Sequence, residues 1–369
     1  MKKKLILLAF VAICSSAIAQ QIDVSADLRM RYEYRHGYST LFADTLKAAN
    51  FITQRSRLNI DFGNKNLKLR ISPQNTRVWG DAATSSKSDI NNQLHEAWAE
   101  LILSNKLSVK AGRQELNYDD ARILGNADWA MQARSHDILL LKLNPDTMNT
   151  LHFGAAVNAN KETNAAEDYA LTNQYKNMQF AWYNGKFGKV SLSFLFMNQG
   201  MPYVKTVKQE LAYDQTFGPR FVFSNKKINA DAAVYLQTGK LGESKVSASY
   251  FSGNIAFKTS AGFVPGAGFE YLSGKAGNST SADIKSFNPW YGTNHKFNGY
   301  MDYFYVGNHI NSVGLTDVYI NLGYEKDKWK LKLTPHYFAT AADLYAGDIK
   351  QDNYLGTEVD LTVNYQIYD

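Results

Sequence analysis

Ile22–Arg35 reads IDVSADLRMRYEYR, and its side chains alternate between two kinds. Every even position from Ile22 to Tyr34 is apolar or aromatic, whereas every odd position is charged or serine. Successive side chains of a β-strand point to opposite faces, so this period of two predicts a strand with one oily face and one wet face. The alternation is longer than an ordinary globular strand of about 5–6 residues. It fits a tilted membrane strand of about 9–11 residues that continues beyond the bilayer.

The same alternation returns along the chain and is divided by short polar turns. One turn is Gly63–Asn66, which separates two alternating runs. Further short breaks lie at 104–106, 144–146, 184–186, 224–226 and 325–328. Longer polar segments lie at 36–50, 80–92, 114–132, 159–174, 199–214, 275–312 and 341–353. Short turns that alternate with long loops are typical of an outer-membrane barrel, with the turns on the periplasmic side and the loops outside the cell.

We therefore predict an all-β fold, a transmembrane antiparallel up-and-down β-barrel of about sixteen strands with both chain ends on the periplasmic side. The 13% aromatic content fits, because Tyr and Trp settle at membrane interfaces. A mean hydropathy of −0.36 does not oppose this reading, because half of every barrel strand faces a polar lumen. A large soluble β-sandwich or β-helix is the alternative, but those folds rarely show this rhythm of turns and loops.

The first residues are typical of a secretory signal peptide. Residues 2–4 are lysines, residues 5–13 form a short apolar run, and small residues follow at the positions that a signal peptidase requires. We predict that residues 1–19 are removed as a signal peptide and that residues 20–369 form the barrel. The expected location is the outer membrane of a Gram-negative bacterium.

Cys14 is the only cysteine. Lipid attachment at Cys14 is an alternative to signal cleavage, although Ile13 is bulky where a small residue is needed. Without Cys14 the chain has no thiol for catalysis or for metal and iron–sulfur sites. Loss of the three leading lysines lowers the formal net charge from +6 to +3. This mild balance predicts a local basic surface and not a nucleic-acid partner.

Four segments carry a more specific pattern than barrel rhythm. They are Arg70–Asp81 (RISPQNTRVWGD), Leu94–Leu101 (LHEAWAEL), Ala111–Asn126 (AGRQELNYDDARILGN) and Asp128–Asp137 (DWAMQARSHD). These segments resemble the alginate-export family of outer-membrane barrels. The strong part of the resemblance covers residues 55–143, and a weaker similarity lies at 297–305. The resemblance implies a barrel of eighteen strands whose basic lumen conducts an anionic uronate polysaccharide outward.

The last residues depart from the usual barrel ending, in which an aromatic residue closes the final strand. Here Val363–Asp369 reads VNYQIYD, which resembles the approach to a periplasmic turn. We expect either that a C-terminal hairpin is missing from this sequence, which would bring the count to eighteen, or that the barrel is a sixteen-strand variant.

Residues that alternate with the lipid-facing set point into the lumen of a barrel. On the first three predicted strands the cations of this set are Arg29, Arg31, Arg35, Arg55, Arg57, Lys68 and Arg70. The anions of the set are Asp23, Asp27, Glu33 and Asp61. Arg113, Arg122 and Arg134 flank a long segment that can fold inward and narrow the pore. A cation-lined channel concentrates anions, although the same charges can instead neutralise one another in ladders across strands.

Tyr118, Asp119, Asp120 and Asp128 invite a calcium reading, but no EF-hand spacing supports it. We expect these acids to pair with Arg113, Arg122 and Arg134 and to hold the loop. No metal or other cofactor is predicted.

An enzyme is the rival class, but the sequence has neither a Gly-x-Ser-x-Gly elbow nor a His-Glu-x-x-His helix. His136 and Asp137 are adjacent, so on a strand they face opposite ways and cannot form a dyad.

The predicted function is a passive outer-membrane channel for anionic solutes, including a uronate polysaccharide such as alginate. The alternatives are a general porin and a non-conducting barrel whose loops, at Asn278 and 289–305, bind carbohydrate or another partner. We expect lipid around the barrel, an anionic poly- or oligosaccharide inside it, periplasmic export partners, no nucleic acid and a monomeric chain.

Overall fold

A computed structural model of the chain describes residues 21–89, 91–164, 169, 174–304 and 311–368. The predicted signal peptide at 1–19 lies outside this part. Within the described residues, no helix has the length and apolar character that a membrane span demands.

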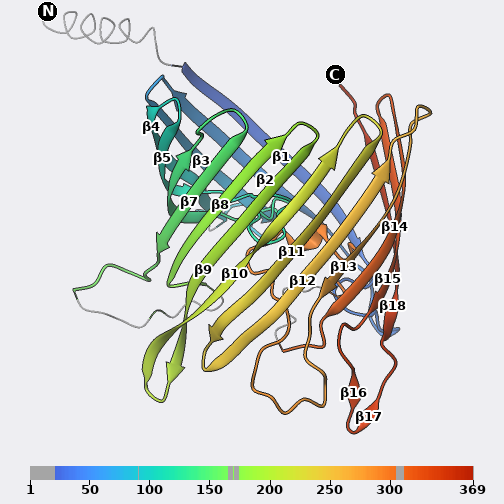
Figure 1. Ribbon diagram of the computed structural model, residues 1–369. Coiled ribbons are helices and arrows are strands. Elements are labelled where there is room, and N and C mark those ends of the chain that lie inside the picture. The colour runs from blue at the N-terminus through green and yellow to red at the C-terminus, as the bar shows by residue number, and fades with distance from the viewer. Residues whose placement is uncertain (1–20, 90, 165–168, 170–173, 305–310, 369) are drawn as a thin grey trace, which may run out of the picture.

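Sixteen strands form one antiparallel sheet that curls into a barrel (Figure 1). In sheet order the first eight are β1 (Gln21–Arg35), β2 (Ala49–Gly63), β3 (Leu67–Val78), β4 (Asn92–Ser104), β5 (Leu107–Gln114), β6 (His136–Leu143), β7 (Asn149–Val157) and β8 (Asn177–Phe187). The others are β9 (Val190–Lys205), β10 (Lys208–Ser224), β11 (Ile228–Leu241), β12 (Ser244–Phe257), β13 (Phe263–Leu272), β14 (Leu315–Lys326), β15 (Trp329–Ala339) and β18 (Tyr354–Tyr365). The short strands β16 (Tyr345–Ala346) and β17 (Ile349–Lys350) pair separately.

The prediction of an up-and-down sheet of about sixteen strands is therefore confirmed. β1 and β18 are the two ends of the sheet, and within the described residues no ladder joins them. β1 begins and β18 ends at the same end of the barrel, where the turns are short (Figure 1). The long loops and the β16–β17 hairpin lie at the opposite end.

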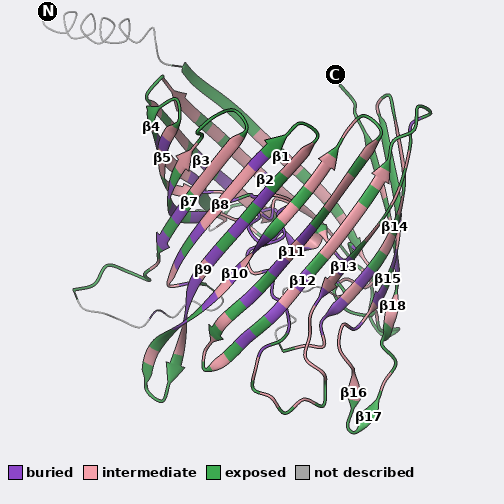
Figure 2. Cartoon of the chain, viewed as in Figure 1, coloured by how far each residue is buried: buried purple, intermediate pink, exposed green. Residues whose placement is uncertain are grey.

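The two faces of the sheet follow the alternation in the sequence. On β1, the side chains of Leu28, Met30 and Tyr32 face outward and are 57–64% exposed. In the membrane these side chains would contact lipid. Their neighbours Arg29 and Arg31 face the lumen, where they contact an inward segment of the chain. Figure 2 shows the same alternation as bands of different burial along the strands.

One turn and one loop differ from the prediction. The expected turn at 184–186 is part of β8, and the chain reverses instead after Phe187, where Gly188 has φ +64°. Asn184 and Gly185 pair with β9 and the ladder continues to Phe187, so the chain reverses at Gly188, where glycine adopts the positive φ without strain. The expected loop at 199–214 is a β-hairpin of β9 and β10, which stay paired as far as Lys205 and Lys208. Strand pairing outside the membrane does not need apolar alternation, so the polar composition of this segment was misleading.

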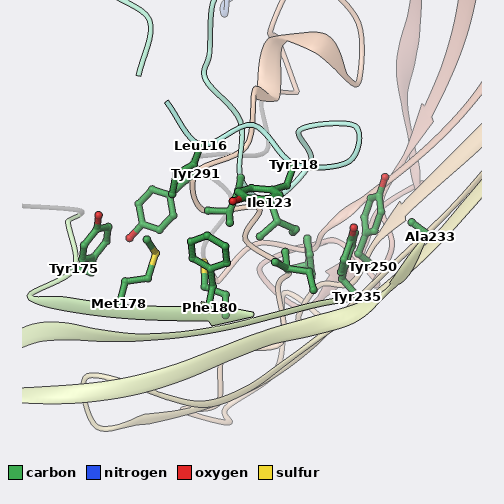
Figure 3. Packing of buried hydrophobic residues seen from close by; sticks show 14 of the residues in the cluster. Leu116, Tyr118, Ile123, Tyr175, Met178, Phe180, Ala233, Tyr235, Tyr250 and Tyr291 are labelled. Atoms are coloured by element: carbon green, nitrogen blue, oxygen red, sulfur yellow. The ribbon is translucent and has the colours of Figure 1, made fainter. Parts of the chain in front are cut away.

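Apolar packing lies inside the barrel, against one side of its wall. Leu116, Tyr118 and Ile123 of the segment after β5 pack on wall residues such as Phe180 and Tyr235 (Figure 3). This side of the wall therefore carries apolar side chains toward the lumen, and the first inward loop covers them.

Phe194 on β9 faces outward near the middle of the apolar band. A charge at the bilayer midplane costs about 2–4 kcal/mol. Phe194→Arg should lower the free energy of unfolding by that amount in lipid vesicles, measured by urea titration. Ser25→Arg, on the lumen face of β1, is the control and should change it little. Equal losses in the two variants would contradict the assignment of faces.

Candidate functional site

Two segments that enter the barrel form the core of the site. The first inward loop is residues 115–135, between β5 and β6, and the second inward loop is residues 283–304, between β13 and β14. They are joined backbone to backbone, because the Gly125 amide donates to the Tyr291 carbonyl at 2.9 Å and the Thr293 amide to the Ala121 carbonyl at 2.8 Å. A Cβ on Gly125 would clash with Thr293, so the close approach of the two loops requires glycine there.

Arg134 strengthens this junction from within the first inward loop. Its guanidinium donates to the carbonyl oxygens of Gly125 at 3.2 Å and Gly292 at 3.0 Å, and also to that of Tyr291. One side chain thus crosslinks both loops. This arginine serves the loop junction more than the wall of an open pore.

Asp128 of the first inward loop is held by two arginines of the barrel wall. Arg29 on β1 contacts one carboxylate oxygen at 2.7 Å, and Arg55 on β2 contacts the other at 2.7 Å. Arg55 also pairs with Asp27, and only 2% of its side chain is exposed. Burial opposes the charged form of Asp128, but the hydrogen bonds from Arg29 and Arg55 outweigh burial and lower the pKa of Asp128.

Arg57 lies beside Arg55 on β2 and is less completely satisfied. Its Nε donates to Gln74 at 2.8 Å, and its nearest carboxylate within the described chain, Glu115, is 3.8 Å away. The second terminal nitrogen of Arg57 is buried, and no described residue accepts a hydrogen bond from it. A buried donor without an acceptor is unfavourable, so this nitrogen suits an anionic ligand.

Arg122 crosses to the opposite wall. It is fully buried, pairs with Glu270 of β13 at 2.7 Å, and donates to Asn298 of the second inward loop at 3.0 Å. The rings of Tyr250 and Phe297 lie 4.9 and 4.4 Å from its guanidinium carbon. Arg122 thus ties both inward loops to the wall by charge, hydrogen bonding and cation–π contact.

The second inward loop also connects the two ends of the sheet. The amides of Tyr300 and Met301 donate to Asp360 at 3.1 Å and Glu358 at 2.8 Å, both on β18. The Ser39 amide, just beyond β1, donates to the Met301 carbonyl at 2.9 Å. β1 and β18 are therefore linked through this loop, although no ladder joins them in the described chain.

Comparison with known proteins identifies the family of this chain. A family model described as alginate export matches residues 20–367. The chain belongs to the alginate export family. A search of curated proteins found no match.

Solved structures similar to this alginate-export-family chain are outer-membrane barrels. OccAB4 of Acinetobacter baumannii has a TM-score of 0.61 at 11% identity, covering 95% of this chain and 88% of its own. OccK9 (OpdG) of Pseudomonas aeruginosa has a TM-score of 0.60 at 12% identity, covering 94% and 88%. OmpF of Salmonella typhi, in complex with daunomycin, has a TM-score of 0.53 at 10% identity, covering 94% and 97%. At these identities the similarity establishes the fold alone. Fold and family together make the chain a channel of the Gram-negative outer membrane.

The arginines predicted to line the lumen of this family member do different things. Arg29, Arg55, Arg122 and Arg134 hold the inward loops, and Arg31 donates to the Trp129 carbonyl of the first loop at 2.8 Å. These contacts agree with the alternative reading of structural charge pairing. In that sector of the described wall, the buried nitrogens without an acceptor are Nε of Arg55, whose terminal nitrogens are both paired, and one terminal nitrogen of Arg57, which has no short ion pair.

The remaining predicted cations lie elsewhere. Arg70 pairs with Asp61 at 2.7 Å and Glu96 at 3.2 Å in the periplasmic half of the lumen, and Lys68 is exposed on the same strand. Arg113 does not lie in the lumen with Arg70 and Lys68. It pairs with Asp137 at 2.9 Å, on the face of the sheet that carries the exposed Leu139, so it lies outside the lumen. Its position on β5 has the parity of outward residues.

The acids of the first inward loop have other partners than those predicted. Asp120 pairs with Arg220 of β10 at 3.2 Å, and Asp119 accepts a hydrogen bond from Trp182 of β8 at 3.1 Å. Burial raises the pKa of Asp119. The sequence reading missed Arg220, although extending the alternation along β10 would have placed it in the lumen.

His136 and Asp137 lie on opposite faces, as predicted, with His136 bonded to Tyr175 inside the barrel at 2.9 Å.

A cavity of about 220 Å³ remains between the second inward loop and the end of the barrel that carries the short turns. Arg220, Lys296 and Lys332 are the lysine and arginine residues that line it.

Arg122→Met should leave the Glu270 carboxylate buried without its partner. Breaking a buried pair in this way costs about 3–5 kcal/mol. We expect faster hydrogen exchange across residues 116–126, measured by mass spectrometry. The double variant Arg122→Met/Glu270→Gln should recover much of the protection, and a double variant no better protected than the single one would contradict the role of the pair.

The lowered pKa of Asp128 sets a pH dependence for loop docking. A depressed carboxyl pKa contributes stability above the unfolded value, about 4, and that stability is lost as pH falls through the folded value. A fluorophore on Gln132→Cys should therefore report a docked loop at pH 7 and at pH 5, with release only below about pH 4. Adding Asp128→Asn should loosen the loop around residues 128–132 at pH 7, while Arg122 and the backbone bonds to the second inward loop still hold the rest. A loop that stays docked in this variant would contradict the anchor.

Proposed function

We propose that this chain is a passive channel for anionic solutes, with an acidic uronate polysaccharide such as alginate as the solute that fits it best. The family and the barrel neighbours are transport proteins, which supports a channel as the general class. The anionic solute and the arginine lining are our proposal. It further includes transport without catalysis, by a single chain, with periplasmic export partners supplying the polysaccharide.

The observation that carries the proposal is the state of Arg57. Its guanidinium is confined between Arg55 and Gln74, and one nitrogen is buried with no acceptor among the described residues. Arginine keeps its charge at every physiological pH and binds carboxylates through two parallel hydrogen bonds. We propose that the Arg57 side chain turns toward a passing uronate carboxylate, which then satisfies this nitrogen.

The inward loops explain how a wide barrel becomes selective. They occupy part of the lumen, so a passing solute runs close to the charged wall and its charges are little screened. On the side of the short turns, three cations line the remaining cavity together with four acids, which are Asp120, Asp231, Glu270 and Asp360. We propose that these mixed charges give weak, repeated contacts, since conduction requires that the solute can also leave.

Arg57→Gln tests the proposal directly, because it removes the charge and keeps a hydrogen-bonding side chain. Single channels in a planar bilayer under a salt gradient should show an anion-selective reversal potential in the parent protein. The variant should shift that potential toward zero, and block by added oligouronate should weaken by roughly tenfold, as expected for one charge-assisted bidentate contact. Arg113→Gln removes the same charge from the outer face and should change neither quantity.

The other outcomes distinguish the alternatives. Open channels with no selectivity and no block would indicate a general porin. A folded barrel that never conducts would indicate a closed barrel whose loops bind a partner outside the cell. Equal changes in Arg57→Gln and Arg113→Gln would contradict the role of the lumen wall.

A further inference from the structure

The outer face of the barrel carries a row of polar side chains where lipid contact would predict apolar ones. Gln179, Asn198, Gln215, Thr238 and Ser247 are direct cross-strand partners on five successive strands, β8 to β12. They share the outward face with the exposed Phe196, Leu236 and Phe251. We call these five residues the polar row.

Neighbours in the polar row bond to one another. Asn198 donates to Gln179 at 2.8 Å, Gln215 donates to Asn198 at 2.8 Å, and Thr238 donates to Gln215 at 3.4 Å. Amides and hydroxyls keep further donors and acceptors after such bonds. An outward surface of this kind is unfavourable against hydrocarbon and favourable against sugar hydroxyls.

The polar row lies near the extracellular limit of the membrane. Asn198 is about eight residues along β9 from its start at the periplasmic turn, which is roughly 20 Å along the barrel axis for a strand tilted by about 40°. The apolar band of such barrels is about 25 Å tall. On the periplasmic side of the row, the outward residues are mostly apolar and include Phe194, Phe196 and Phe217, with Ser249 of β12 as a polar exception. The row therefore faces the level at which the outer leaflet changes from acyl chains to headgroups.

Two lysines lie next to the row on its extracellular side. Lys240 and Lys245 are direct cross-strand partners at the ends of β11 and β12, two positions beyond Thr238 and Ser247, and both are exposed. Within the described chain, neither lysine has a carboxylate at ion-pair distance. The nearby Glu243 pairs with Lys205 instead, at 3.2 Å. Like charges directly opposite on a sheet repel. An anion between them would remove the repulsion.

We propose that the outward face of β8–β12 binds the headgroup of a phosphorylated glycolipid of the outer leaflet, lipopolysaccharide. Lys240 and Lys245 bind a phosphate, and the polar row hydrogen-bonds the adjoining sugars. Lysine binds phosphate as a point charge, and charged residues near a membrane surface contribute about 1 kcal/mol each toward anionic lipid. The site lies on the outside of the barrel and is independent of conduction through the lumen.

The test is native mass spectrometry of the detergent-solubilised full chain with bisphosphorylated lipid A. The Lys240→Gln/Lys245→Gln variant should bind lipid A roughly 10- to 30-fold more weakly than the parent, the factor expected for two such lysines. The matched control is Lys226→Gln/Lys227→Gln, a lysine pair at the periplasmic turn between β10 and β11, which should bind as the parent does.

Each further result supports or overturns the assignment. Weaker binding of dephosphorylated lipid A, and failure of millimolar inorganic phosphate to displace the lipid, would support a glycolipid site. Displacement by inorganic phosphate would indicate a free-anion site instead. Equal binding of phosphatidylglycerol, equal affinity in both lysine variants, or no lipid A bound to the parent would overturn the proposal.

Discussion

Lipid offers no hydrogen-bond partner to a peptide group, and this constraint shapes the whole chain. A strand can cross the membrane only when both of its neighbours satisfy its amides and carbonyls, so the sheet must curl and each strand must carry one oily face and one wet face. Of the sixteen strands, the fourteen from β2 to β15 are paired on both sides, and β1 and β18 are paired on one side within the described residues. The wet faces then surround a lumen much larger than their own side chains can fill. The two inward loops follow from that surplus, because they bring both apolar and charged groups to cover the wall.

The charged side chains of the lumen wall chiefly hold the inward loops in place. Asp128 is held by Arg29 and Arg55 in pairs that remain partly exposed, and Arg122 reaches Glu270 on the opposite side in a buried pair, so the loops are tied to distant strands. Pairs of this kind specify geometry more than they add stability, since desolvation offsets much of the attraction. Arg57 lies two residues from Arg55 on the same face of β2. The arginines that hold Asp128 and the arginine that we propose for anion recognition, Arg57, therefore share one sector of the wall, formed by β1 and β2.

Most of the fold was predictable from alternation alone, because a strand between lipid and water has no freedom to deviate from it. Ile22–Arg35 already assigns Arg29 and Arg31 to the lumen, and the structure keeps them there. The partners of these residues were not predictable. Asp128 pairs with residues 99 and 73 positions away along the chain. Arg122 and Arg134, which are close to it in sequence, have other partners, because the path of the loop determines which side chains meet. Arg113 was misplaced because its parity on β5 was not traced, and the hairpin at 199–214 was misread because pairing beyond the membrane needs no apolar face.

The central claim is that the first inward loop lies in the lumen and sets both the width and the selectivity of the pore. The most direct measurement is the single-channel conductance of a variant in which residues 116–132 are replaced by a short Gly-Ser linker, with barrel folding checked by heat-modifiable gel migration. The account predicts a larger unitary conductance than that of the parent chain and a weaker preference for anions. A folded variant with the parent's conductance and selectivity would contradict it, because the loop would then lie outside the conducting path.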